Sequence, residues 1–233
     1  MTMVGLAAAA AAASHVDIAA LATKARTDFW ALREDAFASR TLNDDLAGRS
    51  FSITVSPTNG DRTTPDVSNG SYYSYKNGIL TVRLSGSQVK SSDDNKQSTY
   101  SQIIPFSVIN KVVEVSDGVN GYGARVKFVT RSIRESGIYP VSGLDRTNFE
   151  FSEKIEGAAA KALALSAKFE IRGTVERLPS GHIGACSTDY VGATVDSPVE
   201  LATVSCWIGA KIDSVALVSP SGTLRSWKAP SSS

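Results

Sequence analysis

Cysteine is scarce in this 233-residue chain, and several metal and redox signatures are missing. No Cys-x-x-Cys pair occurs, which argues against a thiol–disulfide redox role. The only histidines are His15 and His182, and with Cys186 and Cys206 they match no zinc-ligand spacing. The one glycine-rich stretch, around Gly121–Gly123, lacks the spacing of a dinucleotide-binding loop. We therefore expect neither a metal site nor a cofactor.

An excess of charge of either sign is also absent. The chain carries 24 Lys and Arg against 23 Asp and Glu, for a net charge of +1, and the two signs are interspersed. Without a basic stripe, electrostatic binding to nucleic acid or to an anionic membrane is not expected. No run beyond the first thirteen residues is apolar enough to span a bilayer, which needs about 20 apolar residues. We expect no transmembrane segment in the mature chain.

The first 14 residues have the size and composition of a signal peptide or its remnant. A weakly apolar run, with alanine from Ala7 to Ala13, ends at Ser14, as in the apolar core and small-residue exit of export signals. No Lys or Arg precedes it, so the basic start of such a signal would have to lie upstream. An alanine-rich N-terminus of a cytosolic protein is the alternative.

Two cysteines with none left over predict one disulfide, Cys186–Cys206, and with it an oxidising compartment. The enclosed segment is rich in Ser, Thr, Asp, Gly and Pro. Closing a loop of about 20 residues stabilises a fold by about 3 kcal/mol in the chain-entropy model. Two buried free thiols are the alternative. Together with the leader, the pair predicts a periplasmic or secreted protein.

Two amphipathic helices are predicted, over residues 16–40 and 153–168. In the first, Ser14 and Asp17 form a start signature, and apolar residues recur with a 3.6-residue period. Those residues are Ile18, Leu21, Ala22, Ala25, Phe29, Leu32 and Ala36. The second is rich in Ala, Leu, Lys and Glu, which favour helix. Its predicted stripe is Ile155, Ala159, Ala162, Leu163 and Ser166.

The rest of the folded chain is predicted to be strands joined by turns and polar loops. Asn77-Gly78 predicts a type I′ hairpin turn that pairs Tyr75 with Leu80, Tyr73 with Val82 and Tyr72 with Arg83. Alternating or β-branched patterns predict further strands. They cover 50–56, 103–115, 124–131, 168–176, 204–208, 212–218 and 223–227, the last two joined by a turn over 219–222. Residues 56–70 and 85–99 are expected to be polar loops.

These elements predict an α+β fold, mainly an antiparallel sheet with two helices, since no strand–helix–strand alternation supports a parallel sheet. The expected organisation is a helix with antiparallel strands over 15–145, a second such unit with the disulfide over 146–228, and a disordered tail over 229–233. The two units could also form one continuous domain.

No catalytic residue is predicted. His182 lies in a turn with Asp189 and Asp196 nearby in sequence, but no G-x-S-x-G elbow supplies a nucleophile. The adjacent acids Asp44-Asp45 and Asp93-Asp94 fall in loops, where carboxylates are usually solvated. An enzyme is therefore less favoured than a non-enzymatic protein.

A weak ligand-binding candidate remains on the outer face of the predicted hairpin. Tyr72 and Arg83 would lie side by side there, in an arrangement suited to stacking a sugar or a cation. The favoured hypothesis is an exported, non-enzymatic binding or interaction module of the bacterial periplasm, whose partner is another envelope protein or a glycan. A hydrolase with dispersed active-site residues and a structural subunit of an envelope or secretion assembly are the alternatives.

Overall fold

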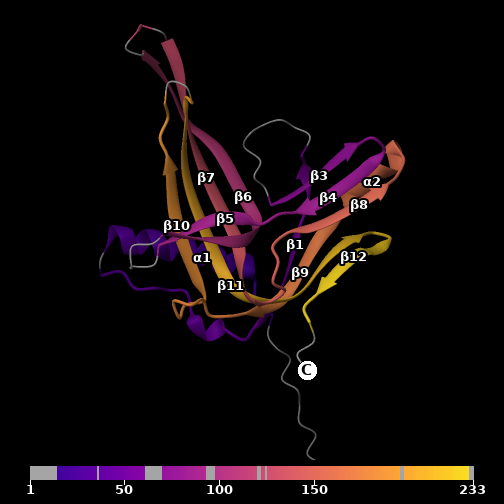
Figure 1. Cartoon of the computed structure of the whole chain (residues 1–233). Helices are drawn as coiled ribbons and strands as arrows, with labels where there is room; N and C mark the ends of the chain where they lie inside the picture. The colour runs from indigo at the N-terminus through magenta and orange to yellow at the C-terminus, as the bar shows by residue number, and fades with distance from the viewer. Residues whose placement is uncertain are drawn as a thin grey trace, which may run out of the picture.

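The computed structural model describes residues 15–35, 37–60, 70–92, 98–119, 122–123, 125–194 and 197–230 (Figure 1). The predicted signal peptide (1–14), Asp93-Asp94, Asp196 and most of the predicted tail lie outside these residues. The helices are α1 (Ile18–Glu34), the short 3-10 helix η1 (Asp44–Leu46) and α2 (Gly157–Ser166). The strands are β1 (Ser50–Val55), β2 (Thr58–Asn59), β3 (Ser71–Lys76), β4 (Ile79–Leu84), β5 (Ser87–Ser92), β6 (Ser98–Val119), β7 (Arg125–Gly143), β8 (Phe149–Lys154), β9 (Lys168–Val175), β10 (Gly184–Val191), β11 (Val199–Ser219) and β12 (Gly222–Lys228).

Strand β11 is the central strand of the larger sheet, and it pairs with different strands along its length. Its first half pairs with β10 on one edge and with β7 on the other. Its second half pairs with β9 and β12. The sheet order is β1-β9-β11-β7-β6-β5, with β10 and β12 attached to β11. One long strand thus joins the body of the molecule to a projecting arm.

The body is a two-layer packing of sheets around the main core. The smaller sheet, in the order β2-β3-β4-β8, packs its inner side chains against the β1-β9-β11-β12 end of the larger sheet. Strands β4 and β8 supply Leu80, Val82, Leu84 and Phe149, and the facing strands supply residues such as Phe169. Each is at most 2% exposed, as alternating inward-facing positions of packed sheets require. The Trp227 ring meets Phe149 edge-on, with centroids 5.3 Å apart.

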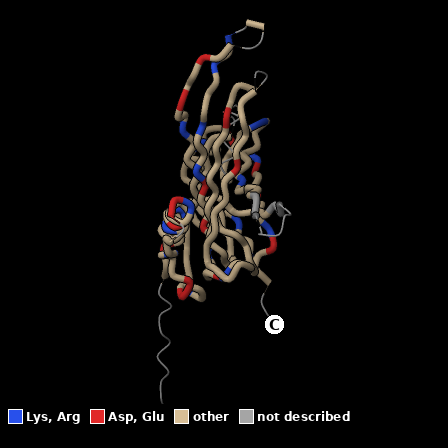
Figure 2. Tube along the Cα trace, turned by 90° about the vertical axis from the view of Figure 1, so that its left-hand side faces the viewer, with Lys and Arg blue, Asp and Glu red and all other residues tan. Residues whose placement is uncertain are grey.

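The arm is the outer part of the larger sheet and rises from the body in Figure 1. It comprises residues 108–119 of β6, 125–135 of β7, 187–191 of β10 and 199–205 of β11. In Figure 2, acidic and basic residues are scattered along its strands.

Helix α1 covers one face of the larger sheet at the root of the arm. Asp17 caps it by accepting hydrogen bonds from the backbone N–H groups of Ala19 and Ala20, while the predicted start residue Ser14 lies outside the described residues. The stripe predicted from the sequence is buried through Ala25, whereas Leu32 is exposed. The helix ends at Glu34 instead of 40, with Asp35 as its C-cap.

The prediction of a mainly antiparallel sheet is correct only in part. The chain is mostly strand with two α-helices, but the sheets are mixed: β11 runs parallel to β7 over a long register, and β2 runs parallel to β3. The connection from β7 to β11 passes through β8, α2, β9 and β10. A strand–helix–strand pattern therefore fails to reveal this parallel pair, because the crossover is built mostly from other strands.

The second predicted helix is wrong at both ends and in its buried face. Helix α2 spans Gly157–Ser166, while Glu153 and Lys154 belong to the edge strand β8 and Lys168 to β9. Its buried residues are Ala160 and Ala164 rather than the predicted stripe. An alanine-rich helix offers no single apolar stripe, so the strands it contacts select the face.

Strand pairing confirms the predicted hairpin and changes the bounds of other predicted elements. The hairpin prediction is confirmed: Asn77 and Gly78 have φ of 55° and 76°, and Tyr72 pairs with Arg83 as expected. The loop predicted at 85–99 instead contains β5, and residues 204–208 and 212–218 belong to the single strand β11. The division at 145/146 remains a prediction, although β1 pairs with β9 and β7 with β11 across it.

Candidate functional site

The predicted ligand-binding pair Tyr72 and Arg83 lies together on the outer face of the smaller sheet. The Arg83 guanidinium donates to the Tyr72 hydroxyl at 3.2 Å and pairs with Glu150 on β8, with Nε and Oε2 2.6 Å apart. Hydrogen bonds to Tyr72 and then to Glu150 raise the pKa of Arg83. The guanidinium is therefore engaged by two neighbours, and a ligand would have to compete with them.

His182 meets Asp44 rather than Asp189. The His182 Nδ1 lies 2.8 Å from Asp44 Oδ2, and the backbone N–H of Ile183 donates to Asp44 Oδ1 at 2.9 Å. Burial raises the pKa of Asp44, but the hydrogen bonds from His182 and Ile183, with Arg177 nearby, outweigh it and leave the pKa below its usual value. The contact ties η1 to the turn before β10, and sequence spacing could not have revealed it.

A hollow with a volume of about 620 Å³ borders the end of β7 and the segment that follows it, and is lined by Gln102 and residues 139–148. Two of its polar groups bond to neighbours: Thr147 donates to Gln102, and Asn148 accepts from the backbone N–H of Gly86. No cluster of His, Cys, Asp or Glu side chains converges among these described lining residues.

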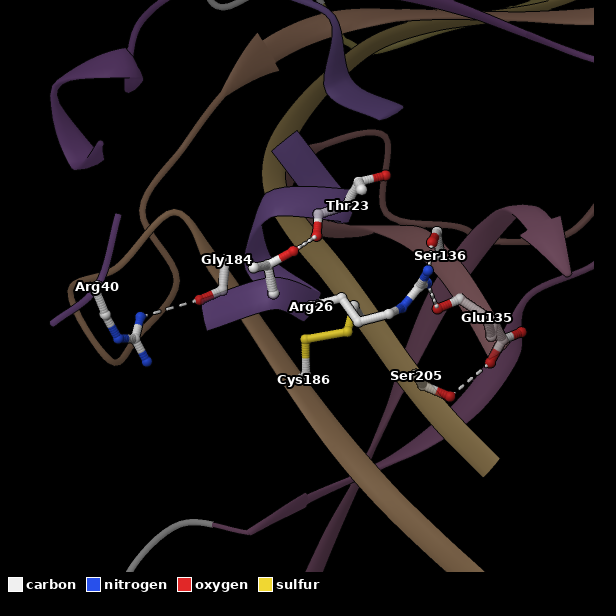
Figure 3. Close-up of a disulfide and its surroundings, with 10 residues drawn as sticks. Thr23, Arg26, Arg40, Glu135, Ser136, Gly184, Cys186 and Ser205 are labelled. Atoms are coloured by element: carbon white, nitrogen blue, oxygen red, sulfur yellow. Dashed lines mark hydrogen bonds between the residues drawn. A yellow bond between two sulfur atoms is a disulfide. The ribbon is translucent and has the colours of Figure 1, made fainter. Parts of the chain in front are cut away.

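The predicted disulfide Cys186–Cys206 is confirmed, and Cys186 lies in β10, in a segment where the sequence predicted no strand. The two cysteines are directly opposite in the β10–β11 ladder, with Cα atoms 4.0 Å apart. Figure 3 shows the bond beneath α1, next to Arg26. The Arg26 guanidinium donates to the Ser136 hydroxyl at 2.5 Å and to the backbone carbonyl of Glu135 at 3.1 Å. These contacts fasten three strands and a helix at the root of the arm.

On the opposite face of the sheet, the side chain of Glu135 is buried, and none of the described cations forms a salt bridge with it. Glu135 is 5% exposed and accepts a hydrogen bond from the Ser205 hydroxyl at 2.9 Å (Figure 3). Burial raises the pKa of this carboxyl, and hydrogen bonds with Ser87 and Ser205 only partly offset the effect. The group lines a hollow of about 200 Å³ between β5 and the arm, together with Val108, Ile133 and Asp189 among other residues. The sequence prediction missed it because the strand expected at 124–131 stops short of Glu135.

One face of the arm is apolar, and it continues outward from this hollow. Residues in register on neighbouring strands share a face, so Val112, Arg131, Leu201 and Val191 form one row across four strands. Val115, Val129 and Val199 form the next row toward the tip. We call this surface the valine face; its apolar members are Val108, Val112, Val115, Val129, Ile133, Val191, Val199 and Leu201.

Within the part of the chain that the structure describes, the valine face is uncovered toward the tip of the arm, whereas Val108 and Ile133 border the hollow beneath β5. Val112, Val115 and Val191 are 53%, 57% and 52% exposed, and Val119 beyond them is 66% exposed. The other face of the arm carries Lys111, Glu114 and Glu200, and also Ile109 and Tyr190, which are 44% and 63% exposed. A β-bulge at Val113 keeps Val112 and Val115 on the same face although they are three residues apart.

Among the described residues, no three His, Cys, Asp or Glu side chains lie close enough to hold a metal ion. The described helices include none with the length and apolar character needed to cross a membrane. No family model, curated protein or solved structure matches this chain.

Proposed function

We propose that this protein is a non-enzymatic interaction module of an extracytoplasmic system and that it binds a protein partner through the valine face of its arm. The observation that carries the proposal is the row of exposed valines on one face of a sheet that projects from the body. Contiguous exposed apolar surface of this kind marks interaction sites, because leaving it in water costs free energy. The disulfide at the root of the arm supports an oxidising compartment.

A protein partner fits the valine face better than a glycan does. Branched aliphatic side chains pack against other apolar side chains, whereas sugar recognition relies on aromatic rings and convergent polar groups. The aromatic candidate, Tyr72 with Arg83, lies on the smaller sheet and is already bonded to Glu150.

Site-specific photocrosslinking tests the proposal. A photoreactive residue at Val115 is expected to give discrete crosslinked products in an envelope extract of the source cells, and one at the exposed Ser226 on β12 is not. Unlabelled protein should compete for these products, whereas the variant Val112→Ser/Val115→Ser should not. Equal crosslinking at both positions, or competition by the variant, would contradict the proposal.

A further inference from the structure

The valine face has a polarity along its length that makes it complementary to itself. At the root, the exposed charged residue is the acidic Asp189, while the carboxyl of Glu135 is buried in the hollow beneath β5. Beyond the valine rows, toward the tip, β7 places Lys127 and Arg125 on the same face, opposite Asp117 and Val119 of β6. The face thus runs from a root with the exposed Asp189, through valine rows that include one cation, Arg131, to a tip with more basic than acidic side chains.

We propose that the occupant of the valine face is a second copy of this chain, packed face to face with its arm antiparallel and related by a two-fold axis near Thr130. This inference rests on the proposed function and names its partner. A two-fold axis there brings the basic tip of each arm over the acidic root of the other, because positions equidistant from Thr130 exchange places. Lys127 then lies over the row of Ile133 and the exposed Asp189, whereas Arg125 comes to the level of β5, which covers Glu135.

The apolar rows also match under the same operation. The row of Val129 in one copy lies over the row of Arg131 in the other. Val115 and Val199 of the first row therefore cover Val112, Leu201 and Val191 of the second. Branched residues from two sheets then interdigitate at about 10 Å separation, as in a β-sandwich. The aliphatic stem of Arg131 can lie along the valines while its charged head reaches the rim.

The dimensions of the arm set the expected strength. The face is about 30 Å long, at about 3.3 Å per residue, and two to four strands wide, at about 4.8 Å per strand. Two such faces bury about 600–1,200 Å², a range around the lower limit of about 1,000 Å² for a specific interface. We therefore expect a reversible dimer with a dissociation constant on the order of 1–100 µM rather than an obligate one.

Sedimentation velocity over a concentration series tests the dimer. The wild-type protein should shift from monomer to dimer across the micromolar range, and raised salt should weaken the dimer because its ends are held by ion pairs. Val115→Lys, which places a charge in the middle of the face, should weaken association at least tenfold. Ser116→Lys, the next residue on the opposite face, is the matched control and should leave association unchanged.

A charge exchange tests the orientation. Lys127→Glu and Asp189→Lys should each weaken the dimer, because each puts like charges together twice, and the double variant should recover association to within a few-fold of the wild type. Failure of the double variant to recover would overturn the antiparallel arrangement. A protein that stays monomeric at several hundred micromolar, or an equal response to Val115→Lys and Ser116→Lys, would overturn the dimer. A monomeric protein that still crosslinks from Val115 to another protein, in a reaction that unlabelled protein inhibits, would support the proposed function and reject the dimer. Absence of such crosslinks would reject both the proposed function and the dimer.

Discussion

Replacing Glu135 with Gln is expected to stabilise the protein increasingly as pH rises. The carboxyl is buried beside hydroxyls and no cation contributes to its pKa, which burial raises above the ordinary value of 4.5. A glutamine side chain keeps nearly the same shape and can bond to both Ser205 and Ser87. The substitution therefore removes the ionisation of this group and little else.

The sign follows from the direction of the shift. A group whose pKa is higher in the folded state contributes its full stability below the unfolded pKa and loses it as pH rises through the folded pKa. The glutamine amide cannot ionise, so the variant avoids this loss. The wild type and Glu135→Gln should be equally stable near pH 4. From pH 4.5 upward the variant should become more stable than the wild type, and the difference should stop growing once the pH passes the folded-state pKa of Glu135.

The slope of that gain is fixed by linkage. In the window between the two pKa values, one proton is linked to unfolding, which gives about 1.4 kcal/mol per pH unit. For a chain of this size, about 1 kcal/mol corresponds to about 2–4 °C in Tm. The Tm difference should therefore widen by about 3–6 °C per pH unit before it levels off.

Differential scanning calorimetry from pH 4 to pH 8 measures this difference. Glu114→Gln is the control, because Glu114 is exposed on the adjacent strand of the same arm and should show no widening. Asp189 lines the same hollow, so Asp189→Asn is measured in parallel. A Tm difference that stays constant with pH, or a wild type that gains on the variant as pH rises, would refute the reasoning.

Three further changes have defined outcomes. The double variant Cys186→Ala/Cys206→Ala removes a disulfide whose cysteines are 20 residues apart in sequence. It should lower the free energy of unfolding by about 3 kcal/mol and the Tm by about 6–12 °C. Reductant should lower the Tm of the wild type but not that of the variant. Asp28→Ala should cost about 2–5 kcal/mol by denaturant unfolding, because the carboxylate accepts from Leu42 N–H at 2.7 Å and from Thr41 N–H at 2.9 Å; a cost below about 1 kcal/mol would contradict this. Burial raises the pKa of Asp28 but its hydrogen bonds lower it further, so its stabilisation should be present above pH 3.8 and fade as pH falls below that, a loss that Asp28→Asn should not show. Gly143→Ala should lower the free energy of unfolding by about 3 kcal/mol or more, because Gly143 has φ of +88° and an added Cβ would collide with the carbonyl of Ile212. An unchanged midpoint of denaturant unfolding would show that the end of β7 can adopt another backbone conformation.

Local patterns predicted local structure well. The Asn77-Gly78 turn fixes the register of its hairpin, and the alternation around Phe169 and Ile171 placed both side chains in the core. In each case the deciding interactions lie within a few residues, so the sequence carries them directly.

Distant pairing decided what local patterns could not. Strand β10 arises in a polar segment that reads as a loop, because β11 supplies a complete ladder of backbone partners for it. Glu153 and Lys154 favour helix by propensity, yet they pair with β4 at a sheet edge, where charged residues are well tolerated. The burial of Glu135 depends on β5 and on Ser205, which lies 70 residues along the chain.

The cysteine pair illustrates the difference between what the sequence predicts and what only the tertiary structure decides. Two cysteines and no others sufficed to predict the disulfide, since bond formation needs only two thiols that can meet. Which strands the bond joins followed from the antiparallel pairing of β10 with β11. That the bond lies at the root of an arm with a valine face followed from the parallel pairing of β7 with β11. That pairing is set by the summed backbone bonds and packing of long strands far apart in sequence, which no local pattern of residues encodes.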